Sequence, residues 1–183
     1  YTDSITVATA DGTTQVITVT MAGTNDAAVI SGTSTATLTE SNVAQSASGT
    51  LAATDVDSAT SFVAQTNVAG TNGYGHFSVD AAGQWTYTMD SAHNEFKAGQ
   101  AYTDSITVAT ADGTAQVVTV TMAGTNDAAV ISGTSTATLT ESNVAQSASG
   151  TLSAADVDSA TSFVAQTNVA GNNGYGHFSV DAA

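Results

Sequence analysis

The chain contains no cysteine and no proline, one basic residue (Lys97) and one tryptophan (Trp85). Without cysteine no disulfide can stabilise the fold, so in an extracellular setting we expect another cross-link, such as a metal ion. No run of 18 apolar residues occurs, so no segment is suited to span a membrane as a helix, and we expect no direct membrane insertion.

The scarcity of basic residues limits the possible partners. Sixteen acidic residues against one lysine give a formal charge of −15 at pH 7. Binding to nucleic acids relies on Lys and Arg side chains that displace counterions, so we expect no nucleic-acid partner. Charged residues still make up only 9% of the chain and hydrophobic residues 42%, which indicates a folded domain whose ionic partners are cations.

The chain repeats itself: residues 1–82 recur as residues 102–183, offset by 101 positions. Only five aligned positions differ, namely Thr14/Ala115, Ile17/Val118, Ala52/Ser153, Thr54/Ala155 and Thr71/Asn172. A period of about 100 residues is the size of a whole domain. We therefore expect the chain to be a window of a longer tandem array. In such an array each repeat contacts the neighbouring identical repeats of the same chain. Residues 1–26 would be the C-terminal strands of one repeat, 27–126 a complete repeat, and 127–183 the N-terminal part of the next.

Hydrophobic residues alternate with polar ones in short segments rich in Thr, Val and Ile, a pattern typical of half-buried strands. An Asp-Gly turn at 10–13 joins the first two segments, which favours a hairpin. The expected strands are 4–9, 15–21, 27–31, 35–39, 47–53, 61–67, 76–79 and 84–89, and only 90–99 is expected to form a helical turn. Seven or eight short strands per repeat predict an all-β fold, an antiparallel β-sandwich of immunoglobulin-like kind.

The same alternation predicts which side chains form the core. Trp85 is expected to be its large anchor. The other expected core residues are Ile5, Val7, Val16 or Ile17, Val19, Ile30, Leu38, Leu51, Phe62, Phe77, Val79, Tyr87, Ile106 and Val108.

Acidic and amide side chains gather in turns and at strand ends. They are Asn25 and Asp26, repeated as Asn126 and Asp127; Glu40; Asp55 and Asp57, repeated as Asp156 and Asp158; and Asp104, repeated from Asp3. An Asp-x-Asp turn directs two carboxylates to one side, and oxygen ligands from several loops suit Ca²⁺ better than Mg²⁺ or Zn²⁺. Asp and Asn are also ordinary turn formers. With four such clusters and almost no cation to pair with, the pattern favours calcium as the bound metal.

Five motifs, taken in the order in which they follow one another within a repeat, resemble the VCBS repeat. This is a cadherin-like module of large bacterial surface proteins, notably adhesins exported by type I secretion. The motifs are ATDVD at 53–57, GYGHFSVD at 73–80, GQWTY at 83–87, ADG at 10–12 and GTND at 23–26. The resemblance implies calcium at the junction between successive domains, held by strand-end acids, the linker Asn-Asp and the Asp-x-Asp of the next domain. It also implies an extracellular location on the bacterial surface.

Carried over by position, the resemblance implies one site per junction. Glu40, Asp104, Asn126, Asp127, Asp156 and Asp158 would share the second junction, and Asp3, Asn25, Asp26, Asp55 and Asp57 the first. The linker departs from cadherins, which often have Asp where Gly124 stands, and from family members that often have Pro where Ala128 stands. Fewer ions per junction than in cadherins are therefore expected.

Motifs that would indicate an enzyme are missing: there is no G-x-S-x-G, no H-E-x-x-H and no phosphate-binding loop, so we expect no catalytic site. The expected function is a calcium-rigidified extender of an adhesin acting in cell adhesion or biofilm formation. Two alternatives stay open. One is an extracellular fibre whose subunits complete each other by inter-chain strand exchange. The other is a carbohydrate-binding module that uses exposed aromatic residues such as Tyr74, Tyr87 or Tyr175.

Overall fold

The computed structural model describes residues 1–182, and within them it contains strands, turns and bends but no helix, hence no helix that could span a membrane. The strands are β1 (Thr2–Ala8), β2 (Thr14–Thr20), β3 (Val29–Gly32), β4 (Thr35–Thr39), β5 (Ser46–Thr54), β6 (Gln65–Ala69), β7 (Gly75–Val79), β8 (Gln84–Met89), β9 (Ala101–Ala109), β10 (Ala115–Ala123), β11 (Val130–Gly133), β12 (Leu152–Ala155), β13 (Gln166–Ala170) and β14 (His177–Val180). The all-β fold class predicted from the alternating pattern is confirmed.

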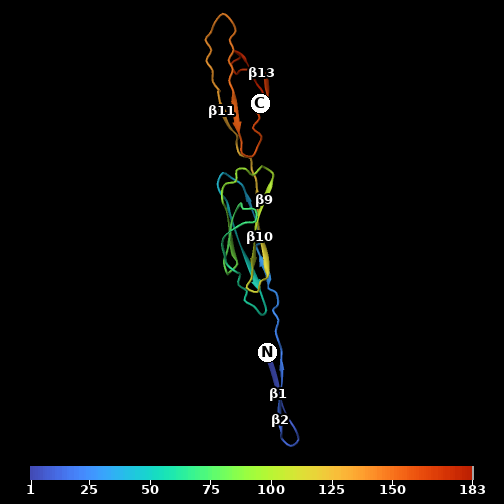
Figure 1. Cartoon of the computed structure of the whole chain (residues 1–183). Coiled ribbons are helices and arrows are strands. Elements are labelled where there is room, and N and C mark those ends of the chain that lie inside the picture. Colours follow the sequence, from blue (N-terminus) through green and yellow to red (C-terminus); the bar gives the residue numbers. More distant parts are fainter. Residues whose placement is uncertain (183) are drawn as a thin grey trace.

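Strands β3 to β10 form a sandwich of two sheets, which is the central body in Figure 1. One sheet has the order β4-β10-β9 and the other β3-β5-β8-β7-β6. All pairings are antiparallel except that of β10 with β4, which is parallel and places Ala123 opposite Thr39. The last strand of the repeat therefore ends beside the residue that precedes Glu40, and both strands point towards the linker to the next unit.

The core lies between these two sheets. Leu51, Phe62, Phe77, Val79, Trp85, Tyr87, Ile106 and Val108 are buried as the alternation predicted, together with Met89, Phe96, Val118, Val120 and Met122. Trp85 is 1% exposed, and its indole N–H donates to the carbonyl of Thr33 at 2.6 Å. Ile30 and Leu38, also expected inside, are only partly buried against the core.

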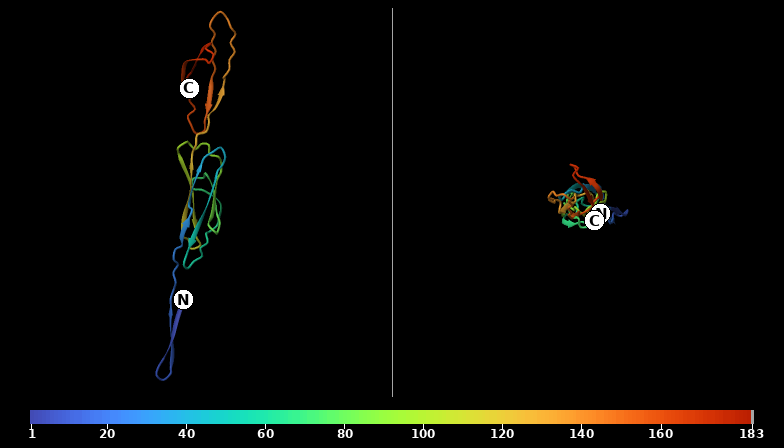
Figure 2. Two further views of the ribbon diagram at one scale, coloured as in Figure 1. Left: turned by 180° about the vertical axis from the view of Figure 1, so that it is seen from behind. Right: turned by 90° about the horizontal axis from the view of Figure 1, so that it is seen from above.

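The chain continues beyond the sandwich at both ends, so the molecule is a narrow rod (Figures 1 and 2). At one end lies the β1–β2 hairpin, in which every residue is exposed. At the other end lies the following unit, in which β11 pairs with β12 and β13 with β14. Identical sequences thus occur in different surroundings within one chain.

Three further expectations from the sequence differ from the structure. Ile5, Val7, Val16, Ile17 and Val19 are exposed, because in the β1–β2 hairpin they have no opposing sheet. The strand expected at 61–67 begins only at Gln65, and Phe62 forms an isolated bridge with Thr110. Residues 90–99 form turns, closed by bonds such as Phe96 N to the His93 carbonyl at 2.9 Å, without a helical element.

Candidate metal centre at the junctions

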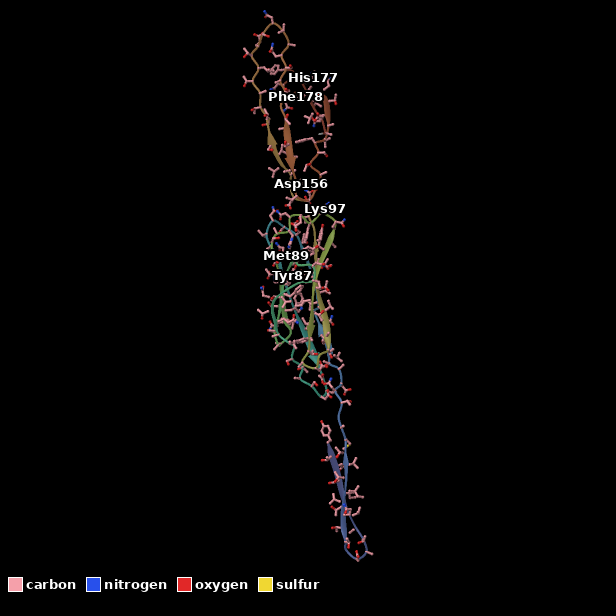
Figure 3. All side chains as sticks on the ribbon, in the orientation of Figure 1. Tyr87, Met89, Lys97, Asp156, His177 and Phe178 are labelled. Carbon is pink, nitrogen blue, oxygen red and sulfur yellow. The ribbon has the colours of Figure 1, made fainter. Side chains whose placement is uncertain are left out.

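The second junction brings together carboxylates from three separate segments. Glu40 follows β4, Asp127 lies in the linker, and Asp156 and Asp158 form the turn after β12. Their proximity is reflected in Asp127: its pKa is raised above the ordinary value of 3.8, first by burial and then by repulsion from Glu40, Asp158 and Asp156. Figure 3 shows Asp156 where the following unit meets the complete repeat. The structure thus concentrates negative charge where the two units join.

Glu40 is held at the end of its strand by the linker. Its backbone N–H donates to the carbonyl of Ala123 at 2.8 Å, continuing the β4–β10 ladder. Its Oε2 atom accepts from the Thr125 N–H at 3.3 Å and from the Thr125 hydroxyl. The residue is only 3% exposed, yet Oε1 has no hydrogen-bond partner. Burying an ionised oxygen without a partner costs free energy, so this atom is suited to receive a cation.

The Asp-x-Asp turn likewise combines a carboxylate held by hydrogen bonds with buried carboxylate oxygens that have no hydrogen-bond partner. Asp156 Oδ1 accepts from the N–H groups of Asp158 at 3.0 Å and Ser159 at 2.7 Å, and these bonds lower its pKa. Asp158 is 6% exposed, and neither of its carboxylate oxygens has a partner. One Asp of the pair therefore fixes the turn, and the other presents both oxygens to the junction.

Four buried carboxylate oxygens at this junction lack a hydrogen bond: Glu40 Oε1, Asp127 Oδ2 and both oxygens of Asp158. Asn126 joins the group, since its Oδ1 accepts from the Ser159 hydroxyl at 3.0 Å and its side-chain N–H donates to the Asp127 carbonyl at 2.5 Å. Such an oxygen-only set fits Ca²⁺, which takes six to eight oxygens in flexible geometry. As the side chains stand, residues 1–182 contain no group of three or more His, Asp or Glu side chains already arranged to hold a metal.

The first junction uses the corresponding residues. Asp26 N–H donates to both carboxylate oxygens of Asp57, at 3.3 and 3.2 Å, and the Ser58 hydroxyl donates to Asn25 Oδ1 at 2.5 Å. Asp55 Oδ1 accepts from Asp57 N–H at 2.9 Å, while its Oδ2 is buried and unpaired. The linker is thus tied to the Asp-x-Asp turn at this junction as well.

A further acid, Asp112, belongs to the first junction and was not among the sequence-predicted ligands. It lies in the β9–β10 turn, and its Oδ2 accepts from the linker N–H of Ala28 at 2.9 Å. Asp55 and Asp112 are close enough to repel each other, and this repulsion opposes the hydrogen bonds that lower the Asp55 pKa. The Asp-Gly sequence was interpreted as a hairpin turn alone. The signal that could have revealed its role is the position of the turn: the turn between β9 and β10 lies at the end of the sandwich next to the linker at Ala28.

Two predicted ligands lie outside these groups. Asp104 is 1% exposed, and its oxygens accept backbone N–H bonds from Asn72 at 2.9 Å, Tyr74 at 3.1 Å and Gly75 at 3.2 Å. It therefore fixes the 70–75 turn inside the repeat. Its counterpart Asp3 is exposed in the β1–β2 hairpin and accepts from Ser4 N–H.

Gly124, where cadherins often have Asp, is buried beneath the 90–100 loop. A Cβ atom there would lie 2.4 Å from the Lys97 carbonyl oxygen and 2.6 Å from that of Phe96. No side chain fits, so this position cannot supply a ligand. The structure gives a physical reason for the departure noted in the sequence.

Of the three aromatic residues considered for sugar binding, one is buried and one is partly buried. Tyr87 is fully buried, and burial raises its pKa well above the ordinary value of 10.0. Tyr74 packs edge-on against His93, Phe96 and Tyr102, with ring centroids 4.9 to 6.1 Å apart. Tyr175, 96% exposed, is the one of the three that is fully accessible for such contacts.

A β-sandwich repeat joined to its neighbours through acidic linkers is the class of protein that this fold and these junctions define. The family model of the bacterial cadherin-like domain matches residues 25–124, more than half of the chain, and the chain belongs to that family. No curated protein matches the chain. Bacterial cadherin-like domains are typically parts of extracellular surface proteins.

Proposed function

We propose that the chain is an extender segment of a bacterial cell-surface adhesin, stiffened by calcium and serving cell adhesion or biofilm formation. The observation that carries the proposal is the set of four unpaired, buried carboxylate oxygens at the second junction. Membership of the cadherin-like family supports the adhesin setting. We also propose that its repeats are VCBS repeats of an adhesin exported by type I secretion.

The junction residues suggest how such stiffening would work. Glu40 is fixed to the complete repeat by its bond to Ala123, Asp127 belongs to the linker, and Asp158 belongs to the following unit. Without a cation their like charges repel, which favours separation of the units. A bound Ca²⁺ would supply positive charge shared by all three segments. Glu40, Asn126, Asp127, Asp156 and Asp158 would hold it, and the angle between the two units would become fixed.

Small-angle X-ray scattering of the whole chain, with calcium and then with EDTA, tests this proposal. We expect a longer, stiffer particle in calcium, with a higher melting temperature, because ligand binding to the folded state stabilises it. The double variant Asp156→Asn, Asp158→Asn should lose most of the response of the second junction. Asp11→Asn is the control for loss of a carboxylate away from the junctions, since Asp11 lies in the β1–β2 turn and bonds only within that turn. Unchanged shape and melting in calcium would refute the proposal.

The fibre alternative retains one specific observation. Ile5 and Val7 are 62% and 40% exposed in the β1–β2 hairpin, whereas the corresponding Ile106 and Val108 are buried in the sandwich. A hairpin with an unpaired apolar face is suited to complete a sandwich in another chain. Sedimentation over a hundredfold concentration range distinguishes the two functions: a single species favours the extender, and growing oligomers favour the fibre.

A further inference from the structure

Lys97, the chain's one basic side chain, lies at the end of the complete repeat that carries the second junction (Figure 3). Its backbone is packed on Gly124, since a Cβ at Gly124 would stand 2.4 Å from the Lys97 carbonyl oxygen. The next residue, Thr125, donates to Glu40 Oε2. The Lys97 backbone thus lies beside the residue that precedes Thr125, and its flexible four-carbon side chain starts at this end of the repeat.

No acid inside the repeat takes up this lysine. Glu95, two residues earlier, is bonded to His93 Nδ1 at 2.7 Å, and Asp90 is bonded to His76 Nδ1 at 2.6 Å. In the described residues 1–182 these are the two ion pairs, and Lys97 takes part in neither. The junction does hold acids without partners: Glu40 and Asp158 are more than nine-tenths buried and carry unpaired oxygens.

We propose that Lys97 is the built-in counter-ion of the second junction, which holds the metal-free junction together and sets the calcium concentration at which it stiffens. This inference rests on the proposed function for its calcium part only. A positive charge close to the carboxylates offsets their mutual repulsion when no metal is present. The same charge repels Ca²⁺, so it raises the calcium concentration needed for binding. Lys97 therefore stabilises the metal-free junction and weakens the binding of Ca²⁺ to it.

The experiment compares Lys97→Gln with Lys97→Arg, which retains the charge, in the whole chain at low ionic strength. Calcium is titrated while backbone amide NMR signals of residues 125–127 and 25–27 are followed. We expect Lys97→Gln to lower the half-saturating calcium concentration of the second junction by about three- to tenfold, and less at high salt. The first junction is an internal control and should not respond, because it lies at the opposite end of the sandwich from Lys97 (Figure 3). Lys97→Arg should behave as the parent.

A second arm needs no calcium. In EDTA at low salt, Lys97→Gln should lower the melting temperature and loosen the second junction by scattering, while Lys97→Arg should not. If Lys97→Gln changes neither the calcium midpoint nor the metal-free stability, the counter-ion role is wrong even though calcium binds. If the parent signals at 125–127 do not respond to calcium, the proposed function fails, and the EDTA arm alone supports or overturns the role of Lys97.

Discussion

At the scale of single residues, Asp127 shows which charge repulsion a bound cation would reduce. Its pKa is raised by burial and by the charges of Glu40, Asp158 and Asp156. A group whose pKa is higher in the folded state binds a proton more tightly there, so its contribution to stability is largest at low pH and is lost as pH rises through that pKa. At neutral pH the ionised Asp127 therefore destabilises the metal-free junction, and a proton competes with calcium only as the pH falls towards this raised pKa.

Substitution of Asp127 by Asn follows from this reasoning. The amide cannot ionise, so Asp127→Asn should keep or raise the melting temperature in EDTA at pH 7, and should weaken calcium binding at the second junction by about tenfold or more. The calcium-induced rise in melting temperature should shrink for the parent between pH 7 and pH 4, and less so for the variant. Calorimetry across this range measures both effects. A variant less stable than the parent in EDTA would contradict the assigned repulsion.

Asp104 provides the contrasting case of an acid that stabilises a turn. It accepts N–H bonds from Asn72, Tyr74 and Gly75 in a buried position. Removing it leaves buried donors unpaired, so Asp104→Ala should destabilise the repeat by about 3 kcal/mol or more, in calcium and in EDTA alike. Denaturant unfolding monitored through Trp85 measures this effect. A loss that appeared only in calcium would restore Asp104 to the predicted ligand set.

At the scale of the elements, the 90–100 loop determines how the last strand reaches the linker. Gly124 N–H donates to the Gln100 carbonyl at 3.0 Å, and the loop carbonyls of Phe96 and Lys97 leave no room for a side chain. Gly124→Ala should therefore displace the loop and lower the melting temperature by several degrees. Gly23 is its counterpart at the first junction, where a Cβ would meet only Tyr1 Cε2 at 3.7 Å. Gly23→Ala should be nearly neutral, and equal effects of the two variants would contradict this account.

Element by element, alternation of apolar side chains was a reliable guide in those strands of the sandwich whose inner face is covered by the opposing sheet. It predicted the buried faces of β7, β8 and β9, including Phe77, Trp85 and Val108. It was wrong for β1 and β2, because burial depends on an opposing sheet that their own sequence does not specify. Phe96 was missed because the 90–100 loop has no periodicity, and its burial results from stacking on Tyr102 with ring centroids 3.8 Å apart.

The acidic positions were predictable from turn chemistry and repetition, but their grouping was not. Spacing alone could not separate Asp104, satisfied inside a turn, from Glu40, left with an unpaired oxygen at a strand end. Nor could it show that Asp112 reaches the linker at Ala28. These differences depend on which backbone N–H groups lie near each carboxylate, and that is decided by the tertiary fold.

At the scale of the whole molecule, stability is unevenly distributed along the rod. The hydrophobic core cluster of the described residues lies between Leu51 and Met122, whereas β1, β2 and β14 are exposed along their whole length. Segments with little buried apolar surface open at low free energy. Hydrogen exchange should therefore be fast throughout 1–24 and 160–182 and slow in β8, β9 and β10. Calcium should add protection mainly at 125–127 and 156–159, because the proposed site is shared by these segments. Protection spread evenly over the chain would show instead that the end segments are packed, as inter-chain strand exchange requires.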